Sequence, residues 1–230
     1  MAKFKPGPMV GSISGKLGNV VFTRGRYGAV IRTRTIPTLV QTDYTQEARG
    51  RLAALSQAYG ALTAAQKEAW RTWAQVNPVK DRLGDSLFLQ PSAAFVQLNA
   101  NILKAGGSQI TDPPVVNAPD AIAGMSVVAT DAPDSDVAWT SGALGASEVL
   151  FIWAAVIDNP GRAYYRNLLK LVKVSAAAGT TPQAIEPELL LRFGTLLEGQ
   201  KLVVEAEVVD DETGLKSGRV YADCLVTAAA

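Results

Sequence analysis

The first forty-two residues carry seven basic side chains and no acidic one. This segment is rich in Gly, Pro and β-branched residues, and nothing in it reads as a self-contained core. Residues 107–230 reverse the balance, with sixteen Asp and Glu against eight Lys and Arg, so the net charge of +1 conceals a polarised chain. A leading segment of this kind is typical of an assembly protein. We expect residues 1–41 to become ordered by docking onto another subunit.

Residues 19–34 have the length and turn chemistry of a β-hairpin, with strands at 19–24 and 29–34 around Gly25-Arg-Tyr-Gly28. Period-two alternation defines one face on each strand: Val20, Phe22 and Arg24 on the first, and Val30, Arg32 and Arg34 on the second. A lone hairpin is marginal in water, so this one must pair with another sheet edge, in this chain or in a neighbour. The candidate partner-binding residues are Lys16, Arg24, Arg26, Tyr27, Arg32 and Arg34.

A glycine-rich run, residues 11–18, precedes the hairpin. It does not match the phosphate-binding loop, because Leu17 follows Lys16 where that loop requires Ser or Thr. We therefore expect its glycines to serve backbone geometry rather than phosphate binding.

Residues 43–106 are expected to form three helices. Asp43 with Gln46 and Thr63 with Gln66 resemble capping boxes that open the first two, and Pro78 must terminate the second. The third opens at Pro91 or Ser92 and stops at Gly106-Gly107. Apolar residues at helical spacing predict the core of a small three-helix bundle: Leu52, Leu55, Tyr59, Trp70, Trp73, Phe95 and Leu98. The two tryptophans could instead form a stacking platform, but their spacing favours the core.

Beyond residue 107 the alternation becomes strand-like. Residues 108–117 have linker composition, and six strands are expected over 125–130, 136–140, 149–157, 168–174, 201–209 and 218–227. A short helix starts near Pro187, and residues 210–214 close the last hairpin. The sequence thus predicts an α+β protein: an arm with a β-hairpin (1–41), a helical domain (42–107), a linker (108–117) and an antiparallel β-sandwich with one short helix (118–230).

Composition excludes several kinds of active site. The chain has no histidine, and Cys224 is its only cysteine, so histidine-based triads and thiolate metal clusters cannot form. No Gly-x-Ser-x-Gly motif is present. We assign no catalytic, cofactor-binding or metal-binding residues. No run approaches a signal peptide or the roughly 18 to 20 apolar residues of a membrane span, so we expect a chain that is soluble when made.

Two sets of carboxylates remain to be explained. The first lies in loops and comprises Asp131, Asp134, Asp136, Asp210, Asp211 and Glu212. These could bind calcium, but their spacing is not that of an EF-hand, and solvated turns are favoured. The second set is Glu205 and Glu207, which share one face of a strand with one wet side. We expect them to prevent edge aggregation rather than to form a glycosidase pair.

Residues 11–106 carry a resemblance in the order Gly15-Lys-Leu-Gly-Asn-Val-Val-Phe22, Arg26-Tyr-Gly28, Ile31-Arg-Thr-Arg34, Thr45-Gln46, Arg49, Leu62-Thr63, Ala69-Trp70, Ala94-Phe95 and Leu98-Asn99. This order resembles a group of virion structural proteins from tailed bacteriophages. The C-terminal part is similar in outline to the fibronectin-III or immunoglobulin-like domains of such viruses, from which the helix near 187–193 departs.

The resemblance implies a structural role in a virion, after synthesis in the host cytoplasm. We expect a capsid-associated decoration or minor capsid protein, anchored by its arm to a major capsid subunit and repeated as an oligomer in the particle. The first alternative is a head–tail connector or tail protein, which would be present in far fewer copies. The second is a nucleic-acid-binding module that uses Tyr27 and the surrounding arginines. Neither a cofactor nor a membrane is expected.

Overall fold

The structure is a computed structural model that describes residues 2–4, 8, 12–25, 28–35, 42–80, 86–131 and 135–228. Within these residues the chain forms four helices and several antiparallel sheets, so the predicted α+β class is confirmed. Backbone contacts divide the chain into two compact units, Met1–Glu47 and Ala48–Ala230. The finer division of the second unit into a helical domain, a linker and a β-domain stays a prediction.

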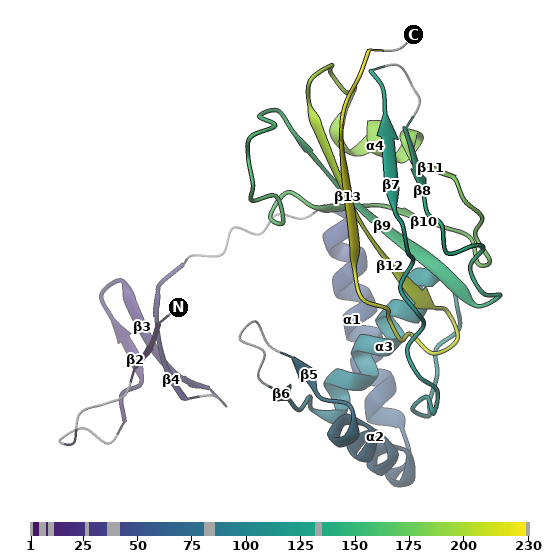
Figure 1. The fold of residues 1–230 in the computed structure, drawn as a ribbon. Helices are drawn as coiled ribbons and strands as arrows, with labels where there is room; N and C mark the ends of the chain where they lie inside the picture. The colour runs from purple at the N-terminus through teal and green to yellow at the C-terminus, as the bar shows by residue number, and fades with distance from the viewer. Residues whose placement is uncertain are drawn as a thin grey trace. The chain divides into compact units, whose positions relative to one another are not determined.

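The first unit contains a four-stranded antiparallel sheet (Figure 1). Its strands are β1 (Ala2–Phe4), β2 (Gly15–Leu17), β3 (Val20–Gly25) and β4 (Gly28–Thr33), in the order β1-β4-β3-β2. The predicted hairpin is confirmed as β3 and β4, and the further sheet edges that it needs come from this chain. Gly15 and Gly18 have φ angles of 118° and 55°, which confirms that these two glycines serve backbone geometry.

Three helices follow: α1 (Asp43–Ala61), which begins in the first unit and continues into the second, and α2 (Ala64–Val76) and α3 (Pro91–Ala105), which lie in the second. The capping box of α2 is confirmed, because Gln66 N donates to Thr63 Oγ1 at 3.3 Å and Thr63 N donates to Gln66 Oε1 at 3.1 Å. The short strands β5 (Val79–Lys80) and β6 (Ser86–Leu87) lie between α2 and α3. Helix α3 ends where Gly106 adopts the left-handed conformation at φ 95°.

The predicted capping box of α1 is wrong by one residue. Thr42, not Asp43, precedes the helix, and Thr45 N donates to Thr42 Oγ1 at 3.3 Å. Thr42 N in turn donates to Thr45 Oγ1 at 3.0 Å. The carboxylate of Asp43 falls in the first turn instead, where the helix dipole favours negative charge.

The helices enclose an apolar cluster that confirms most of the predicted helical core. Leu55, Trp70, Phe95 and Leu98 are buried in this cluster, and Tyr59 and Trp73 are half-buried against it. Trp70 is 0% exposed and its Nε1 donates to Thr111 O at 2.8 Å, so it is a core residue and not a stacking platform. Leu52 was wrongly predicted to be core, since it is 55% exposed. The described residues of α1 that belong to this cluster are Leu55, Ala58 and Tyr59, so Leu52 lies before the part of the helix that the cluster covers.

The rest of the second unit contains two further sheets and one helix. Strands β10 (Lys170–Val174), β9 (Glu148–Ile157), β12 (Lys201–Asp210) and β13 (Val220–Leu225) form one sheet in that order. Strands β11 (Gln183–Ala184), β8 (Ser135–Ala138) and β7 (Ser126–Ala129) form the other. The helix is α4 (Glu186–Phe193), as expected near Pro187. Each of the six predicted strands is present, and β11 was not predicted.

One buried cluster of apolar side chains joins both sheets. It takes alternate residues from β9 and β12, residues from β7 and β8, and Leu189 from α4. The predicted inward face of β12 is confirmed, because Leu202, Val204, Ala206 and Val208 all belong to this cluster. These side chains therefore drive the association of the two sheets by removing apolar surface from water.

The opposite face of β12 corrects the sequence analysis. This face was predicted to be exposed to solvent. Its side chains are instead buried, with exposed fractions of 0 to 4% for Val203, Glu205, Glu207 and Val209. Helix α3 packs against this strand, and cations and aromatic side chains cover the two glutamates. Strand β12 also lies between β9 and β13 in the sheet. The expectation that Glu205 and Glu207 protect a sheet edge is therefore wrong.

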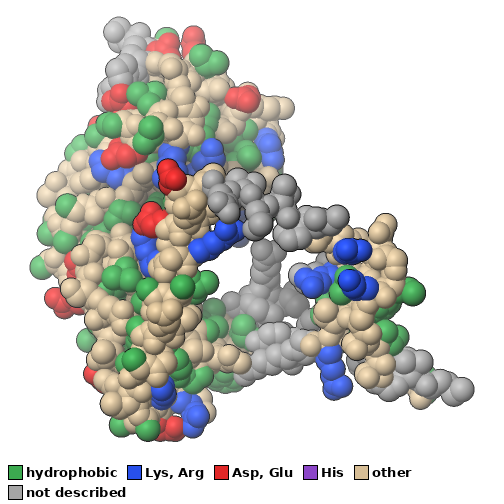
Figure 2. Space-filling view, turned by 180° about the vertical axis from the view of Figure 1, so that it is seen from behind, with side chains coloured by type: hydrophobic (Ala, Val, Ile, Leu, Met, Phe, Trp, Pro, Cys, Tyr) green, Lys and Arg blue, Asp and Glu red, His purple; other side chains and the backbone are tan. Residues whose placement is uncertain are grey.

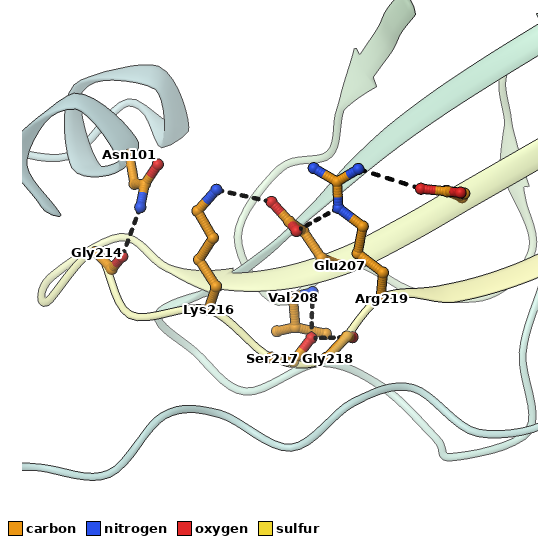
Figure 3. A network of polar contacts seen from close by, with 9 residues as sticks. Asn101, Glu207, Val208, Gly214, Lys216, Ser217, Gly218 and Arg219 are labelled. Atoms are coloured by element: carbon orange, nitrogen blue, oxygen red, sulfur yellow. Dashed lines mark hydrogen bonds and ion pairs between the residues drawn. The ribbon is translucent and has the colours of Figure 1, made fainter. Parts of the chain in front are cut away.

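Helix α3 approaches the turn between β12 and β13 closely. Asn101 Nδ2 donates to Gly214 O at 2.9 Å (Figure 3). A Cβ added to Gly214, whose φ is 72°, would lie 2.3 Å from Leu98 O. A Cβ on Gly107 would lie 2.1 Å from Asp211 O. The predicted turn at 210–214 is confirmed, and it also holds the helices against the β-sheet.

No helix in the described part of the chain has the length and apolarity to cross a membrane.

Candidate functional site

The predicted partner-binding residues lie in the sheet of the first unit. Lys16 is in β2, Arg24 in β3 and Arg32 in β4, while Arg34 follows the end of β4. All four side chains are exposed, and Figure 2 shows basic side chains at the surface of this unit. Arg34 N donates to Asn19 O at 2.7 Å, which fixes the end of the hairpin. Arg26 and Tyr27 lie outside the described residues.

The strand register separates these residues onto two faces. Lys16 pairs with Val21, which pairs with Arg32, so the two cations share one face of the sheet. Arg24 lies on the opposite face at one end of an apolar patch. We call this patch the apolar face; it consists of Leu17, Val20, Phe22, Ala29 and Ile31. The alternation predicted for each strand is confirmed, while only the register reveals that Arg24 and Arg32 point to opposite sides.

This sheet has no buried core among its described side chains. Val20, Phe22, Ala29 and Ile31 are half-buried, and Leu17 is 73% exposed. By comparison, the second unit has three buried clusters. A sheet that buries so little apolar surface gains little stability from the hydrophobic effect.

The exposed cations of this sheet also lack acidic partners within the described residues. Neither Lys16, Arg24, Arg32 nor Arg34 has a described carboxylate within ion-pair distance.

A second candidate site is centred on the two buried glutamates of β12. Arg219 Nε lies 2.9 Å from Glu207 Oε2 (Figure 3), and Arg219 Nη1 lies 3.1 Å from Glu205 Oε2. Lys216 Nζ lies 2.9 Å from Glu207 Oε1. A single guanidinium therefore bridges both carboxylates. Such charge-assisted bonds are what buried carboxylates require.

Aromatic side chains and a helix lysine surround this cluster. The guanidinium carbon of Arg219 lies 4.3 Å from the centre of the Trp153 ring, a cation–π contact. Lys104 of α3 lies 5.2 Å from the centre of the Phe151 ring. Burial lowers the pKa of Lys104, and the positive charge of Lys216 lowers it further, partly offset by Glu207. Burial opposes the charge of Arg219, but its hydrogen bonds and attraction to Glu207 and Glu205 prevail and raise its pKa.

The cluster opens into a cleft of about 520 Å³. Its lining residues are Trp153, Tyr165, Arg166, Leu169, Glu205, Arg219, Val220 and Tyr221. Burial raises the pKa of the Tyr165 phenol, as do the charge of Glu205 and a hydrogen bond with it. Arg166 Nε is 4.0 Å from Glu205 Oε1, and the Arg166 side chain is 77% exposed.

This cleft was not predicted from the sequence. A signal for part of it existed, because the turn at 210–214 fixes the register of β12 and β13. Ala206 pairs with Val220, which brings Arg219 next to Glu207. No comparable signal points to Tyr165 and Arg166, which come from the loop between β9 and β10.

Of the acidic residues expected in loops, Asp136 instead lies in strand β8, whereas Asp210 initiates a turn. Asp210 Oδ1 accepts hydrogen bonds from Glu212 N at 2.8 Å and Thr213 N at 3.2 Å, which stabilise the turn. Asp134, one of the calcium candidates, lies outside the described residues. Among the residues that the structure describes, no group of three Asp, Glu or Cys side chains is placed to hold a metal ion.

Comparison with known proteins gives no relative: no family model matches the chain, and no curated protein matches it significantly.

Proposed function

We propose that the chain is a structural component of a tailed-bacteriophage virion, namely a capsid-associated decoration or minor capsid protein. It attaches to a neighbouring virion subunit through the sheet of its first unit and displays the β-region of its second unit. The order of motifs over residues 11–106 supports this assignment as a resemblance. The observation that carries the proposal is a formed sheet without a buried core, bearing exposed cations that have no described acidic partner.

Attachment combines three kinds of contact. The apolar face buries Leu17 and its neighbours against the other subunit, which supplies the missing core. Lys16 and Arg32 on the other side, and Arg24 at the end of the apolar face, pair with acidic groups. Strands β1 and β2 are the outer strands of the described sheet, and the proposed attachment uses their outer backbone edges to accept a strand of the neighbour.

The same proposal extends to the finer details of the fold. Helices α1, α2 and α3 constitute a small three-helix bundle, which their shared apolar cluster supports. The two sheets of the β-region constitute an immunoglobulin-like or fibronectin-III-like sandwich, which their joint core supports. Helix α4 is an addition to that fold.

The test measures how much of the chain enters purified particles. Deletion of residues 1–41 is expected to abolish incorporation while residues 43–230 remain folded. A subtler variant reverses two charges, Arg24→Glu with Arg32→Glu, and should lower occupancy at least about tenfold by repelling the acidic surface. The matched control reverses two exposed arginines of the second unit, Arg71→Glu with Arg162→Glu, and should leave occupancy unchanged.

The outcome separates the competing roles. Full occupancy of the truncated chain would refute anchoring through the first unit. Quantitative mass spectrometry of intact particles gives the copy number, which is in the hundreds for decoration and about a dozen for a head–tail connector or tail protein. A low number would therefore replace capsid decoration with the connector or tail role while retaining the anchor.

A second candidate function is nucleic-acid binding, which the same exposed Lys16, Arg24, Arg32 and Arg34 favour. Binding of this kind releases counterions, so the logarithm of affinity falls with the logarithm of salt by about 0.9 for each neutralised phosphate of duplex DNA. Titrating the chain with duplex DNA at several salt concentrations measures this slope. Affinity that does not change with salt would exclude this candidate.

A further inference from the structure

The cleft beside Glu205 contains groups whose binding capacity is not used within the described chain. It lies on the side of β9 and β12 that faces away from the joint core of the two sheets, where Trp153 and Glu205 alternate with the core residues. Its volume of about 520 Å³ suits a small ligand or a segment of a larger one.

Arg166 is the first of these groups. Its closest described carboxylate oxygen is Glu205 Oε1 at 4.0 Å, which is too long for a hydrogen bond. The side chain is 77% exposed, so its five N–H donors face the cleft and solvent. A planar guanidinium with free donors binds a carboxylate through two parallel hydrogen bonds.

Glu205 is the second group, and it needs donors rather than acceptors. Its Oε2 accepts a hydrogen bond from Arg219 Nη1 at 3.1 Å. An ionised carboxylate has about four lone-pair positions, so it can accept further hydrogen bonds from ligand hydroxyls. Tyr221, which is 65% exposed, gives the cleft an aromatic wall with a polar tip.

The charges around the cleft favour a ligand with negative charge. Four cations, Arg166, Arg219, Lys216 and Lys104, surround the two carboxylates of Glu205 and Glu207. The local excess is therefore positive, although Glu205 itself would repel an anion placed directly beside it. A suitable ligand must present an acid to Arg166 and hydroxyl groups to Glu205.

We propose that this cleft binds an acidic saccharide, that is, a sugar unit carrying a carboxylate. The carboxylate pairs with Arg166, the sugar hydroxyls donate to Glu205, and the C–H face of the ring packs against Tyr221. A phosphate ion or an acidic peptide offers acid groups to Arg166 but no row of hydroxyl donors for Glu205. This inference goes beyond the structural role proposed above and does not depend on it.

The experiment uses the full chain and isothermal titration calorimetry with five probes. Trigalacturonate and sialyllactose are the acidic saccharides, and the methyl ester of trigalacturonate is the matched neutral ligand. Inorganic phosphate and tetraglutamate represent simple anions and acidic peptides. We expect millimolar or tighter binding of at least one acidic saccharide, weaker binding of its neutral counterpart, and no comparable binding of phosphate or peptide.

Variants then locate the binding site. Arg166→Gln should weaken saccharide binding about ten- to a hundredfold, the value of a charge-assisted hydrogen bond. Because Arg166 is mostly exposed, this substitution leaves the fold intact. The control is Arg71→Gln, an exposed arginine on α2 that does not line the cleft.

Several results would overturn the proposal. They are the absence of binding by both acidic saccharides at millimolar concentration, equal binding of the methyl ester, and unchanged affinity in Arg166→Gln. Binding of phosphate or tetraglutamate as tightly as the saccharide would also overturn it, because the cleft would then be a general anion site.

Discussion

Glu205 illustrates how one residue gains its properties from its neighbours. Alternation along β12 placed it correctly opposite the apolar core, but the same pattern wrongly predicted solvent around it. Its burial follows from Arg219, Tyr165 and Trp153, which arrive from other segments of the chain. Periodicity within a single strand contains no information about them. The prediction that Leu52 is a core residue fails for the same reason. Helical spacing defines an apolar stripe along a helix, but not how much of that stripe the neighbouring helices cover.

Replacing Glu205 should change the ionisation of Tyr165. Burial and the charge of Glu205 raise the pKa of Tyr165 above its usual 10.0. Removing the charge by Glu205→Gln should lower this pKa toward 10.0, as measured by the ultraviolet absorbance of tyrosinate during an alkaline titration. Tyr165→Phe identifies which transition belongs to this residue. A titration of Tyr165 that is the same with and without Glu205 would contradict the assignment.

The raised pKa of Tyr165 also determines how the free energy of unfolding changes with pH. A raised pKa means that folded Tyr165 holds its proton more tightly than the unfolded chain does. Its contribution to the free energy of unfolding is therefore complete below pH 10.0 and is lost as the pH rises through the folded-state pKa. Glu205→Gln should reduce that alkaline loss of stability.

At the scale of elements, local signals predicted most of the second unit. The capping box at Thr63 predicted where α2 begins, and the glycine at Gly106 predicted where α3 ends. Both signals act within one turn of the helix. Alternation located the long strands β9 and β12. Strand β11 was not predicted, because a strand of two residues is too short to show an alternation of apolar and polar side chains. The pairing of sheets and the packing of α3 on β12 require contacts distant in sequence, so no local pattern predicts them.

The close approach of α3 to the β12–β13 turn gives a test at this scale. Gly214→Ala combines a strained positive φ of 72° with a Cβ that would lie 2.3 Å from Leu98 O. Gly199→Ala is the matched control, because its φ is 83° and nothing lies within 4 Å of the added Cβ. The control should cost about 1 to 2 kcal/mol of unfolding free energy. Gly214→Ala should cost at least about 3 kcal/mol, since a packed backbone must also shift.

Urea unfolding followed by circular dichroism measures both changes. Equal losses of stability in the two variants would show that the contact between α3 and the turn is not as close as described.

At the scale of the whole molecule, the two units differ in how they are stabilised. The second has buried clusters around Phe95 and along β9 and β12, whereas the sheet of the first has none among its described side chains. The sequence predicted this contrast, because the basic charge and the pattern of residues 1–41 do not read as a self-contained core. It did not reveal that β1 and β2 would complete a four-stranded sheet, since three-residue strands leave no periodic signal.

Hydrogen exchange should reveal this difference in the full-length chain without a partner. Amides of β3 and β4 are expected to exchange with an opening free energy near zero, because little apolar burial resists opening. Amides at the centres of β9 and β12 should exchange only through global unfolding. Mass spectrometry of peptic fragments resolves the two regions. Comparable protection in both would contradict the view that the first sheet lacks a core of its own.

The close approach of Gly107 and Gly214 to neighbouring main-chain atoms also restricts how this chain can diverge during evolution. Any side chain at either position would collide with main-chain atoms of Asp211 or Leu98, and backbone cannot turn aside as a flexible side chain can. Natural variants should therefore retain both glycines even where surrounding residues have drifted. Gly199, with open space around it, is free of that steric restriction and should tolerate Asn or Asp, which adopt positive φ most readily.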